Sequence, residues 1–510
     1  MRIRILSTAA FLVVATALVA QEPALTQNSS FYANLASFVV ADLADDSRPA
    51  MIGIDGSTSS VVVLKNLGNG KYGPPTFYPV TGGLTGIAVG DFNGDGKLDV
   101  AASMYDYGDS SGKVAILRGK GDTTLEKPIY YTVPLPPNSI AVADFNNDNR
   151  PDIAVIGFSS DNATNTVTIL TNTGSSFTEH SFAAPTLFTT VYSYPDDDEI
   201  IDLVEGDFNG DGRIDLAYID SCMQCDPQQE QPYVLANLAS GWKGYALDSD
   251  SGSGTLSMTA ADIDGDGITD LVIPWHGCYT PCVGVTVLYM DKNFSVVKSL
   301  QLDNPNGYYG PIPSQVVVGD FNNDGITDIA GYSHGGLDQN QNAIPDSIDM
   351  WTGAGNRNFN NVKYYNQSPT VENEGYGGGY TAAGFLTSYP GRDLIVPQSV
   401  LGSDAQVWKN STTEAHDPCP YPTAESGIHV CEPAADSPRG TVQFVASARS
   451  SVQPLNRIEL WVDGKKEVQI FADRLHFELP LANGKHAASF FEVGASGLKT
   501  EKRVEFTVGK

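Results

Sequence analysis

The stretch DFNGDGKLD, from Asp91 to Asp99, is the most informative part of the sequence because four close copies of it follow. The copies are DFNNDNRPD from Asp144, DFNGDGRID from Asp207, DIDGDGITD from Asp262 and DFNNDGITD from Asp320. Each copy has a short apolar run before it and another after it, and successive copies start 53 to 63 residues apart. This near-regular spacing predicts a repeat architecture whose unit is a strand, an acidic loop and a second strand.

Two weaker copies flank the five, namely FVVADLADDSRPAMIGID upstream and TAAGFLTSYPGRDLIVP downstream. The seven units run from Ser29 to Asn410 and average about 55 residues, which is room for four short strands each. Four-stranded sheets repeated around an axis form a β-propeller, so we predict an all-β, seven-bladed propeller. The last unit lacks a fourth strand of its own. We therefore expect the N-terminal segment around Ser30 to Leu35 to pair with the strand that contains Val407.

The acidic loops have the composition of a calcium site. Side-chain oxygens recur at positions 1, 3, 5 and 9, position 6 is glycine or asparagine for a tight turn, and position 7 can offer its main-chain carbonyl. Oxygen ligands without His or Cys favour calcium over zinc or copper. The expected metal-binding residues are Asp91, Asn93, Asp95, Lys97, Asp99, Asp144, Asn146, Asp148, Arg150, Asp152, Asp207, Asn209, Asp211, Arg213, Asp215, Asp262, Asp264, Asp266, Ile268, Asp270, Asp320, Asn322, Asp324, Ile326 and Asp328.

Two alternatives qualify this assignment of about five calcium ions. An EF-hand requires Glu at position 12, where the first copy has Ala102, so the loops are not EF-hands. The loops could also be Asx-turns in tight hairpins that hold no ion. A sixth, weaker calcium candidate has the same spacing inside an inserted loop and consists of Asp338, Asn340, Asn342 and Asp346.

Composition and the N-terminus predict an exported, acidic protein. The formal net charge is −30, which should repel nucleic acids and anionic membranes. Residues 1–20 have two arginines followed by an apolar run, the pattern of a signal peptide, and no later segment is apolar enough to span a membrane. We therefore expect a protein that is secreted or on the cell surface, and a monomer.

The six cysteines form three local pairs in the sequence. The pairs are Cys222 with Cys225, Cys278 with Cys282, and Cys419 with Cys431. In an exported chain such pairs predict disulfide bonds. The alternative is a zinc site of four thiolates from the first two pairs.

The repeat region resembles a known family, the FG-GAP or VCBS-type repeat proteins. The seven-bladed propeller of this family occurs in integrin alpha subunits and bacterial exported proteins. The resemblance covers roughly Ser29 to Asn410 and rests on the five D-[FI]-[ND]-x-D-x-x-x-D loops. It implies calcium in the loop between the first two strands of each of the five units, and partners at the opposite face. The first and last units depart from the pattern, so calcium is not expected there.

The opposite face would carry the loops after each second strand. Counting 14 residues from each first aspartate gives equivalent positions around one rim, namely Tyr105, Phe158, Ser221, His276 and His334. Aromatic and polar groups on a rigid scaffold suit recognition. The alternative is that aromatic residues such as Trp275 and Tyr279 only shield neighbouring strands and disulfides.

The C-terminal part has a different character. We divide the mature chain into a propeller over 21–410, a Pro/Ser/Thr-rich linker over 411–438 and a β-sandwich over 439–510. The last stretch contains six short alternating strands in about 70 residues. It resembles the bacterial Ig-like domains of exported surface proteins.

Three functions stay open, and none has an assigned catalytic residue. The first is a calcium-binding module for adhesion to extracellular protein or glycan partners. The others are a carbohydrate-active enzyme, either a polysaccharide lyase or a hydrolase, and a purely structural envelope component. The sequence GYSHG, residues 331–335, matches the G-x-S-x-G motif, but that motif works on a strand-to-helix turn, and here it ends a predicted strand.

Overall fold

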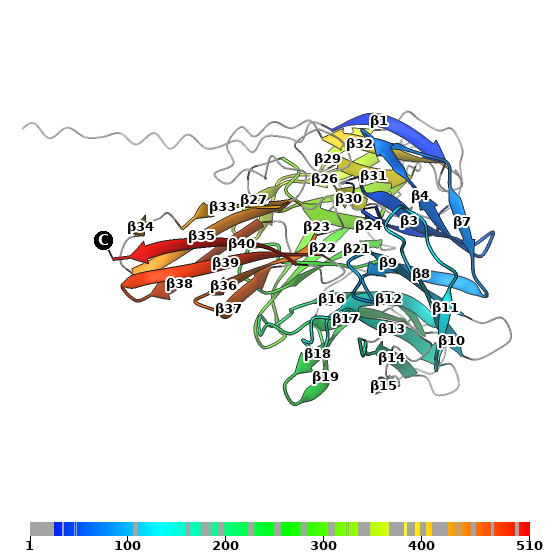
Figure 1. The fold of residues 1–510 in the computed structure, drawn as a ribbon, viewed down its shortest axis with the longest axis horizontal. Helices are drawn as coiled ribbons and strands as arrows, with labels where there is room; N and C mark the ends of the chain where they lie inside the picture. Colours follow the sequence, from blue (N-terminus) through cyan, green and yellow to red (C-terminus); the bar gives the residue numbers. More distant parts are fainter. Residues whose placement is uncertain are drawn as a thin grey trace, which may run out of the picture.

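In the computed structural model of the chain, every regular element among the described residues is a β-strand (Figure 1). The described residues are 25–32, 35–44, 46, 48–105, 111–159, 164–174, 182, 186–191, 198–222, 229–248, 257–276, 283–303, 312–322, 324, 326–334, 347–366, 382–384, 393–397, 404–410, 427–433, 436–437, 440–449, 455–470, 474–494 and 499–509. The predicted all-β fold class is confirmed. The expected signal peptide and the sixth calcium candidate lie outside these ranges. Within them, no helix is long and apolar enough to cross a membrane.

Among the described residues up to Asn410 there are seven antiparallel four-stranded sheets, which we number 1 to 7 along the chain. Two small hairpins, β5(Asn66–Gly68)–β6(Lys71–Tyr72) and β27(Gly353–Gly355)–β28(Asn358–Phe359), extend sheets 1 and 6. The strands of sheets 1 to 4 are β2(Ser37–Ala41), β3(Ala50–Asp55), β4(Ser60–Leu64) and β7(Thr76–Pro79); β8(Gly83–Gly90), β9(Asp99–Tyr105), β10(Gly112–Leu117) and β11(Ile129–Val133); β12(Pro137–Ala143), β13(Asp152–Ser159), β14(Thr164–Leu170) and β15(Thr186–Val191); β16(Asp198–Gly206), β17(Asp215–Cys222), β18(Gln229–Leu238) and β19(Gly241–Ala246). The strands of sheets 5 to 7 are β20(Thr259–Ala261), β21(Asp270–His276), β22(Val283–Met290) and β23(Val296–Asp303); β24(Ile312–Gly319), β25(Asp328–His334), β26(Ser347–Trp351) and β29(Lys363–Asn366); β30(Ala382–Gly384), β31(Asp393–Pro397), β32(Asp404–Asn410) and β1(Leu25–Tyr32).

The N-terminal strand completes the last sheet. Strand β1 pairs antiparallel with β32, with Ser29 opposite Val407, and the two strands lie side by side in Figure 1. The expected pairing is therefore confirmed, although the paired segment is Leu25–Tyr32 and begins earlier than Ser30. Sheet 7 therefore contains strands from both ends of the repeat region. Its strand β1 is followed in the chain by β2, the first strand of sheet 1.

The apolar cores lie between neighbouring sheets. Among the described residues, one cluster joins each sheet to the next, and another joins sheet 7 back to sheet 1. Representative pairs are Val61 with Val100, Val114 with Val155, Ile156 with Leu216, Ala217 with Leu271, Val287 with Ile329, Ala330 with Leu394, and Val407 with Met51. The first strands also contact one another in this order, and β30 contacts β2. Each sheet is thus covered on both faces, which explains why its central strands are apolar at almost every position.

Buried asparagines tie neighbouring sheets together. At or just after the third strands of sheets 3, 4 and 7, the side-chain amides of Asn172, Asn237 and Asn410 each donate to a main-chain carbonyl of the preceding sheet's first loop. The accepting carbonyls belong to Phe92, Phe145 and Phe321, at 2.8, 2.6 and 2.7 Å. These bonds satisfy buried carbonyls that the local strand pairing leaves free.

We predict that Asn237→Ala lowers the free energy of unfolding by about 1–3 kcal/mol, because it removes the donor to two buried carbonyls, those of Phe145 and Ile214. Urea unfolding followed by circular dichroism would measure the change. Asn293→Ala is the control, since Asn293 sits in an exposed turn and bonds only within it. Equal, small effects of the two substitutions would show that the bond between the sheets contributes nothing.

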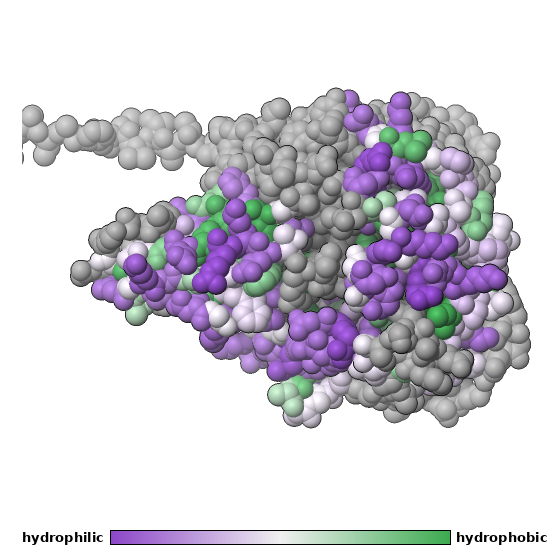
Figure 2. All heavy atoms as spheres, in the orientation of Figure 1, coloured by the Kyte–Doolittle hydropathy of each residue, from purple (hydrophilic) through white to green (hydrophobic). Residues whose placement is uncertain are grey.

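The C-terminal strands form two further sheets around their own core (Figure 1). Apolar side chains from both sheets, such as Phe444 and Phe490, share one cluster. The face of the molecule shown in Figure 2 is mostly hydrophilic, with small apolar patches. The strands are β33(Gly427–Glu432), β35(Gly440–Arg449) and β38(Arg474–Leu481) in one sheet, and β34(Asp436–Ser437), β40(Lys499–Val508), β39(Gly484–Gly494), β36(Leu455–Val462) and β37(Lys465–Ile470) in the other.

The boundary expected for this part needs correction. Strands β33 and β34 lie inside the stretch 411–438 that we expected to be a linker, and β33 pairs with β35. The C-terminal sheets therefore begin by Gly427, because β33 supplies the edge strand of the smaller sheet. Cys431 in β33 is disulfide-bonded. The other cysteine side chains lie outside the described part, so the three predicted pairings stay predictions.

Candidate metal centre

Each of the five acidic loops joins the first strand of a sheet to the second. Position 1 directly follows the first strand, and position 9 is the first residue of the second strand, as in Asp91 after β8 and Asp99 at the start of β9. The same holds for the loops that begin at Asp144, Asp207, Asp262 and Asp320. The predicted strand, loop and strand unit is therefore confirmed in sheets 2 to 6.

The carboxylates and amides at positions 1, 3 and 5 fold each loop around itself. The position 1 carboxylate accepts the N–H of position 5, the position 3 oxygen accepts the same N–H, and the position 5 carboxylate accepts the N–H of position 7. All five loops repeat these three bonds, at distances between 2.8 and 3.2 Å. The side-chain oxygens are thus drawn toward the inside of the loop, as a hard-cation site needs.

Left-handed backbone makes this turn possible. Position 6 has a positive φ in the first four loops, and Asn149 adopts 65° where the other three have glycine, as we predicted for an asparagine there. Position 4 is left-handed as well, for example at Asn147 with φ 59°. Gly or Asn at position 4 of these loops is a sequence signal for this conformation that was not part of the predicted pattern.

The position 9 aspartates are buried and fix the loop to the sheet. One oxygen of Asp215 accepts the N–H of Phe208 at position 2, and the other accepts the N–H of Asn237 on the third strand, at 3.1 and 2.7 Å. The other four position 9 aspartates make the same two bonds, and none of the five is more than 1% exposed. The aspartate at position 9 therefore stabilises the fold, in addition to any role as a metal ligand.

Burial disfavours the ionised form of these carboxylates. Burial, with a further contribution from the aspartates at positions 1 and 5, raises the pKa of Asp99 and Asp152 to about 7 and that of Asp215 to about 8. Burial and the carboxylates of Asp262 and Asp264, at positions 1 and 3, hold the pKa of Asp270 well above the usual range. Burial and the aspartates at positions 1 and 5 do the same for the pKa of Asp328. Several like charges held together away from water favour either protons or a bound cation.

This predicts a pH dependence for the chelated protein. The folded-state pKa values of about 7 and 8 exceed the unfolded value of about 3.9, so the folded state binds extra protons. The melting temperature measured in a chelator should therefore fall as pH rises from about 4 through about 8. Saturating calcium should flatten that dependence because it displaces the protons. A chelated melting temperature that rises over this window would contradict the prediction.

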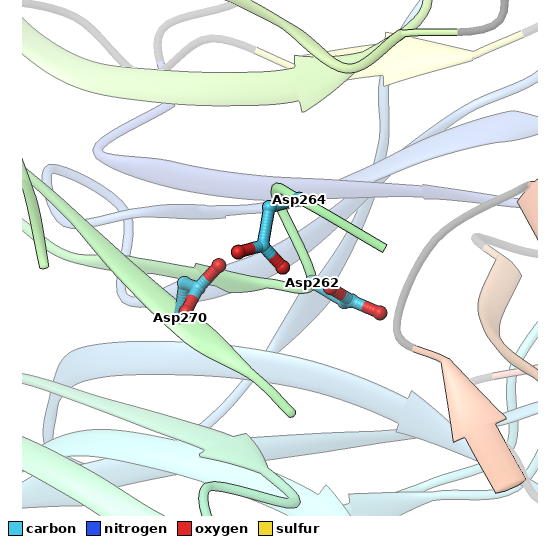
Figure 3. A group of neighbouring side chains, drawn as sticks. All are labelled: Asp262, Asp264 and Asp270. Carbon is cyan, nitrogen blue, oxygen red and sulfur yellow. The ribbon is translucent and has the colours of Figure 1, made fainter. Parts of the chain in front are cut away.

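In the fourth loop, three described carboxylates lie close enough together to hold a metal ion. Oxygens of Asp262, Asp264 and Asp270, at positions 1, 3 and 9, all lie within 4.8 Å of one another. Figure 3 shows the carboxylates of Asp264 and Asp270 turned toward each other, with Asp262 beside them. An oxygen-only set of this kind fits a calcium ion.

Two of the side chains at position 7 form ion pairs that the sequence pattern did not lead us to predict. Arg150 and Arg213 form ion pairs with the outer oxygens of Asp148 and Asp211 at position 5 of their own loops. Only the main-chain carbonyl of position 7 was expected to take part. The signal was available, because a cation two residues after a carboxylate in a tight turn can reach back to it.

The five candidate rim positions lie at equivalent places in their sheets. Tyr105, Phe158, Ser221, His276 and His334 each lie within the last two residues of the second strand of their sheets. Tyr105 is 39% exposed, and the side chains of the other four lie outside the described part. Ser333 of the GYSHG motif is fully buried and donates to Asp349, which leaves it no access to a substrate.

Comparison with protein families finds two matches in the repeat region. Residues 42–102 and 207–273 match the FG-GAP-like repeat. The chain carries FG-GAP-like repeats. The matched stretches contain the loops that begin at Asp91, Asp207 and Asp262, together with the weaker copy at Asp42. No curated protein matches the chain.

Solved structures that match the chain do so at low identity. A rhamnogalacturonan lyase, YesW, is 13% identical with a TM-score of 0.42, over 78% of this chain and 76% of the lyase. The biofilm matrix protein Bap1 of V. cholerae is 13% identical with a TM-score of 0.28, over 74% of this chain and 77% of Bap1. A protein from Lactobacillus plantarum is 13% identical with a TM-score of 0.39, over 74% and 94% of the two chains.

Proposed function

We propose that the protein is a calcium-binding β-propeller that serves as an extracellular binding module for a protein or glycan partner. The observation that carries this proposal is the fivefold repetition of one loop, in which an aspartate buried at position 9 lies beside further carboxylates. An Asx-turn alone does not require buried, mutually repelling charges, whereas a divalent cation stabilises them. The FG-GAP-like repeats support the same assignment.

The architecture that we propose for this function is a ring of seven blades, one for each four-stranded sheet. The continuous order of apolar clusters between the sheets and the pairing of β1 with β32 support it. We further propose that the C-terminal sheets are an Ig-like spacer or second contact module, and that the chain is exported as a monomer. In this arrangement the five cations lie in the first loops, and the second-strand ends lie at the other edge of the ring.

The proposed partner surface is that second edge, around Tyr105. Loops there are free to vary because the sheets hold their ends, while the cation loops stiffen the opposite edge. An exposed aromatic ring suits stacking on a sugar or packing on a protein side chain. The cations act on stability and not on chemistry, so no catalytic residue is assigned.

Metal analysis and a binding array test the proposal together. Protein dialysed against calcium should carry about five ions per chain, one for each loop. On an array of glycans and extracellular matrix proteins, the protein should be retained in calcium, and Tyr105→Ala should weaken retention. Fewer than three ions per chain would contradict the cation assignment. Release of reducing sugar or of an unsaturated product from an arrayed polysaccharide would contradict the binding function.

A further inference from the structure

The fourth loop differs from the other four in charge. It has Asp264 at position 3 where the others have asparagine, so it holds four carboxylates and they hold three. The second and third loops also carry an arginine at position 7, whereas the fourth has Ile268. The fourth loop thus has the highest negative charge and lacks a cation of its own at position 7.

An arginine from the next sheet supplies the missing charge. Arg357 lies in the β27–β28 hairpin of sheet 6, and its Nε forms an ion pair with the Oδ2 of Asp264. Its Nη2 lies 3.2 Å from the Oδ2 of Asp266. The guanidinium carbon also lies 5.2 Å from the ring centre of Tyr289 in sheet 5. The two carboxylates that it contacts occupy positions 3 and 5.

The hairpin presents Arg357 at a conformational cost. Arg357 has a φ of 59°, and in the matching hairpin of sheet 1 the equivalent residue is Gly70 with a φ of 68°. A left-handed backbone favours glycine, so arginine at this position is a strained choice. The ammonium of Lys298 in β23 donates a hydrogen bond to the main-chain carbonyl of Arg357. This bond ties the hairpin to sheet 5.

A buried polar group beside the cluster is consistent with a ligand there. Tyr289 is fully buried, and within the described part of the chain its hydroxyl makes no hydrogen bond. Burial, followed by the carboxylates of Asp270 and Asp264, raises the pKa of this hydroxyl. A bound ion with its hydration water would give the hydroxyl the partner that the side chains around it do not.

From these observations, and resting on the calcium function proposed above, we propose that Arg357 is a built-in counter-charge of the fourth loop. It neutralises one of the four carboxylates across the boundary between sheets 5 and 6, while the inner oxygens remain for the cation. The fourth loop then binds calcium in the same concentration range as the three-carboxylate loops. Its affinity is therefore set by a residue about 90 positions away in the sequence.

Hydrogen exchange with mass spectrometry can test this loop by loop in the full chain. The protection of each loop peptide is followed against free calcium, so that each loop gives its own midpoint. We expect Arg357→Gln to move the midpoint of the 262–270 peptide to about three- to tenfold lower calcium, because a positive charge in contact with two carboxylates of the loop is lost. Arg357→Lys, which keeps the charge without the fork, should move it less.

The second arm of the test uses Asp264→Asn, which gives the fourth loop the composition of the others. In that background Arg357→Gln should shift the midpoint less than twofold, since the guanidinium has lost its ion pair with Asp264 and keeps only the longer contact with Asp266. The other four loops are internal controls and should stay within twofold. An unshifted or higher midpoint for Arg357→Gln alone, or equal shifts in both backgrounds, would overturn the proposal. If no loop responds to calcium, it is the cation function itself that fails.

Discussion

Removal of calcium by a chelator is expected to lower the melting temperature of the seven sheets and to leave the C-terminal sheets almost unchanged. Extracellular calcium sites bind at about 10⁻⁴ to 10⁻³ M, and each contributes about 1.4 kcal/mol for every tenfold excess of calcium over its dissociation constant. Five such sites together supply several kcal/mol, which is comparable with the whole stability of a domain. The C-terminal sheets have no loop of this kind among their described residues.

Differential scanning calorimetry with and without a chelator would resolve the two parts as separate transitions. Asp46→Ala is the control, because the weak copy in sheet 1 has Ala44 where a ligand would stand. That substitution should leave the calcium-dependent shift intact. If the first transition keeps its temperature in the chelator, the five loops are hydrogen-bonded turns and hold no ion that matters to stability.

Asp215→Ala is expected to be the most destabilising single substitution in a loop, at about 3–5 kcal/mol. It leaves two buried N–H groups, those of Phe208 and Asn237, without an acceptor, and each costs about 1–3 kcal/mol. It also removes a candidate calcium ligand. The loss should persist in a chelator, because the orphaned donors do not depend on an ion. Urea unfolding in both conditions measures it.

Asp211→Ala at position 5 of the same loop is the matched comparison. Its carboxylate accepts from Arg213 and Asn209 in the exposed part of the loop, and these bonds are worth little because water replaces them. We expect its substitution to cost stability in calcium and almost none in the chelator. Equal losses for Asp215→Ala and Asp211→Ala in the chelator would refute the structural role of position 9.

The sequence predicted the loops well because every group in them is local. Positions 1, 3 and 5 fold onto main-chain N–H groups two to five residues away, so nine residues contain both partners of almost every bond. The same locality made Asn149 readable as a left-handed residue. The period of the copies, with apolar runs on both sides, was enough to predict the four-stranded sheets.

The ends of the chain were predicted less accurately. Strand β1 was placed correctly beside β32 because one strand was missing from the last unit, but its bounds depend on pairing across almost 400 residues. The stretch 411–438 is rich in Pro, Ser and Thr and so predicts a linker, although it contains β33. Strand β33 pairs with the edge of β35, and the amino-acid composition of a stretch does not reveal such a pairing.

The repeat, the acidic loops and the all-β class can be predicted from the sequence alone, because they follow from residue types at short, fixed spacings. Which distant residues complete the loops depends on how the sheets pack against one another. The amide of Asn237 reaches the loop of the preceding sheet, and Arg357 reaches Asp264 from the following one. Both partners lie about 90 residues from the atoms they contact. Packing between sheets sets these contacts, because a buried carbonyl or carboxylate takes whatever donor the neighbouring sheet brings within 3 Å.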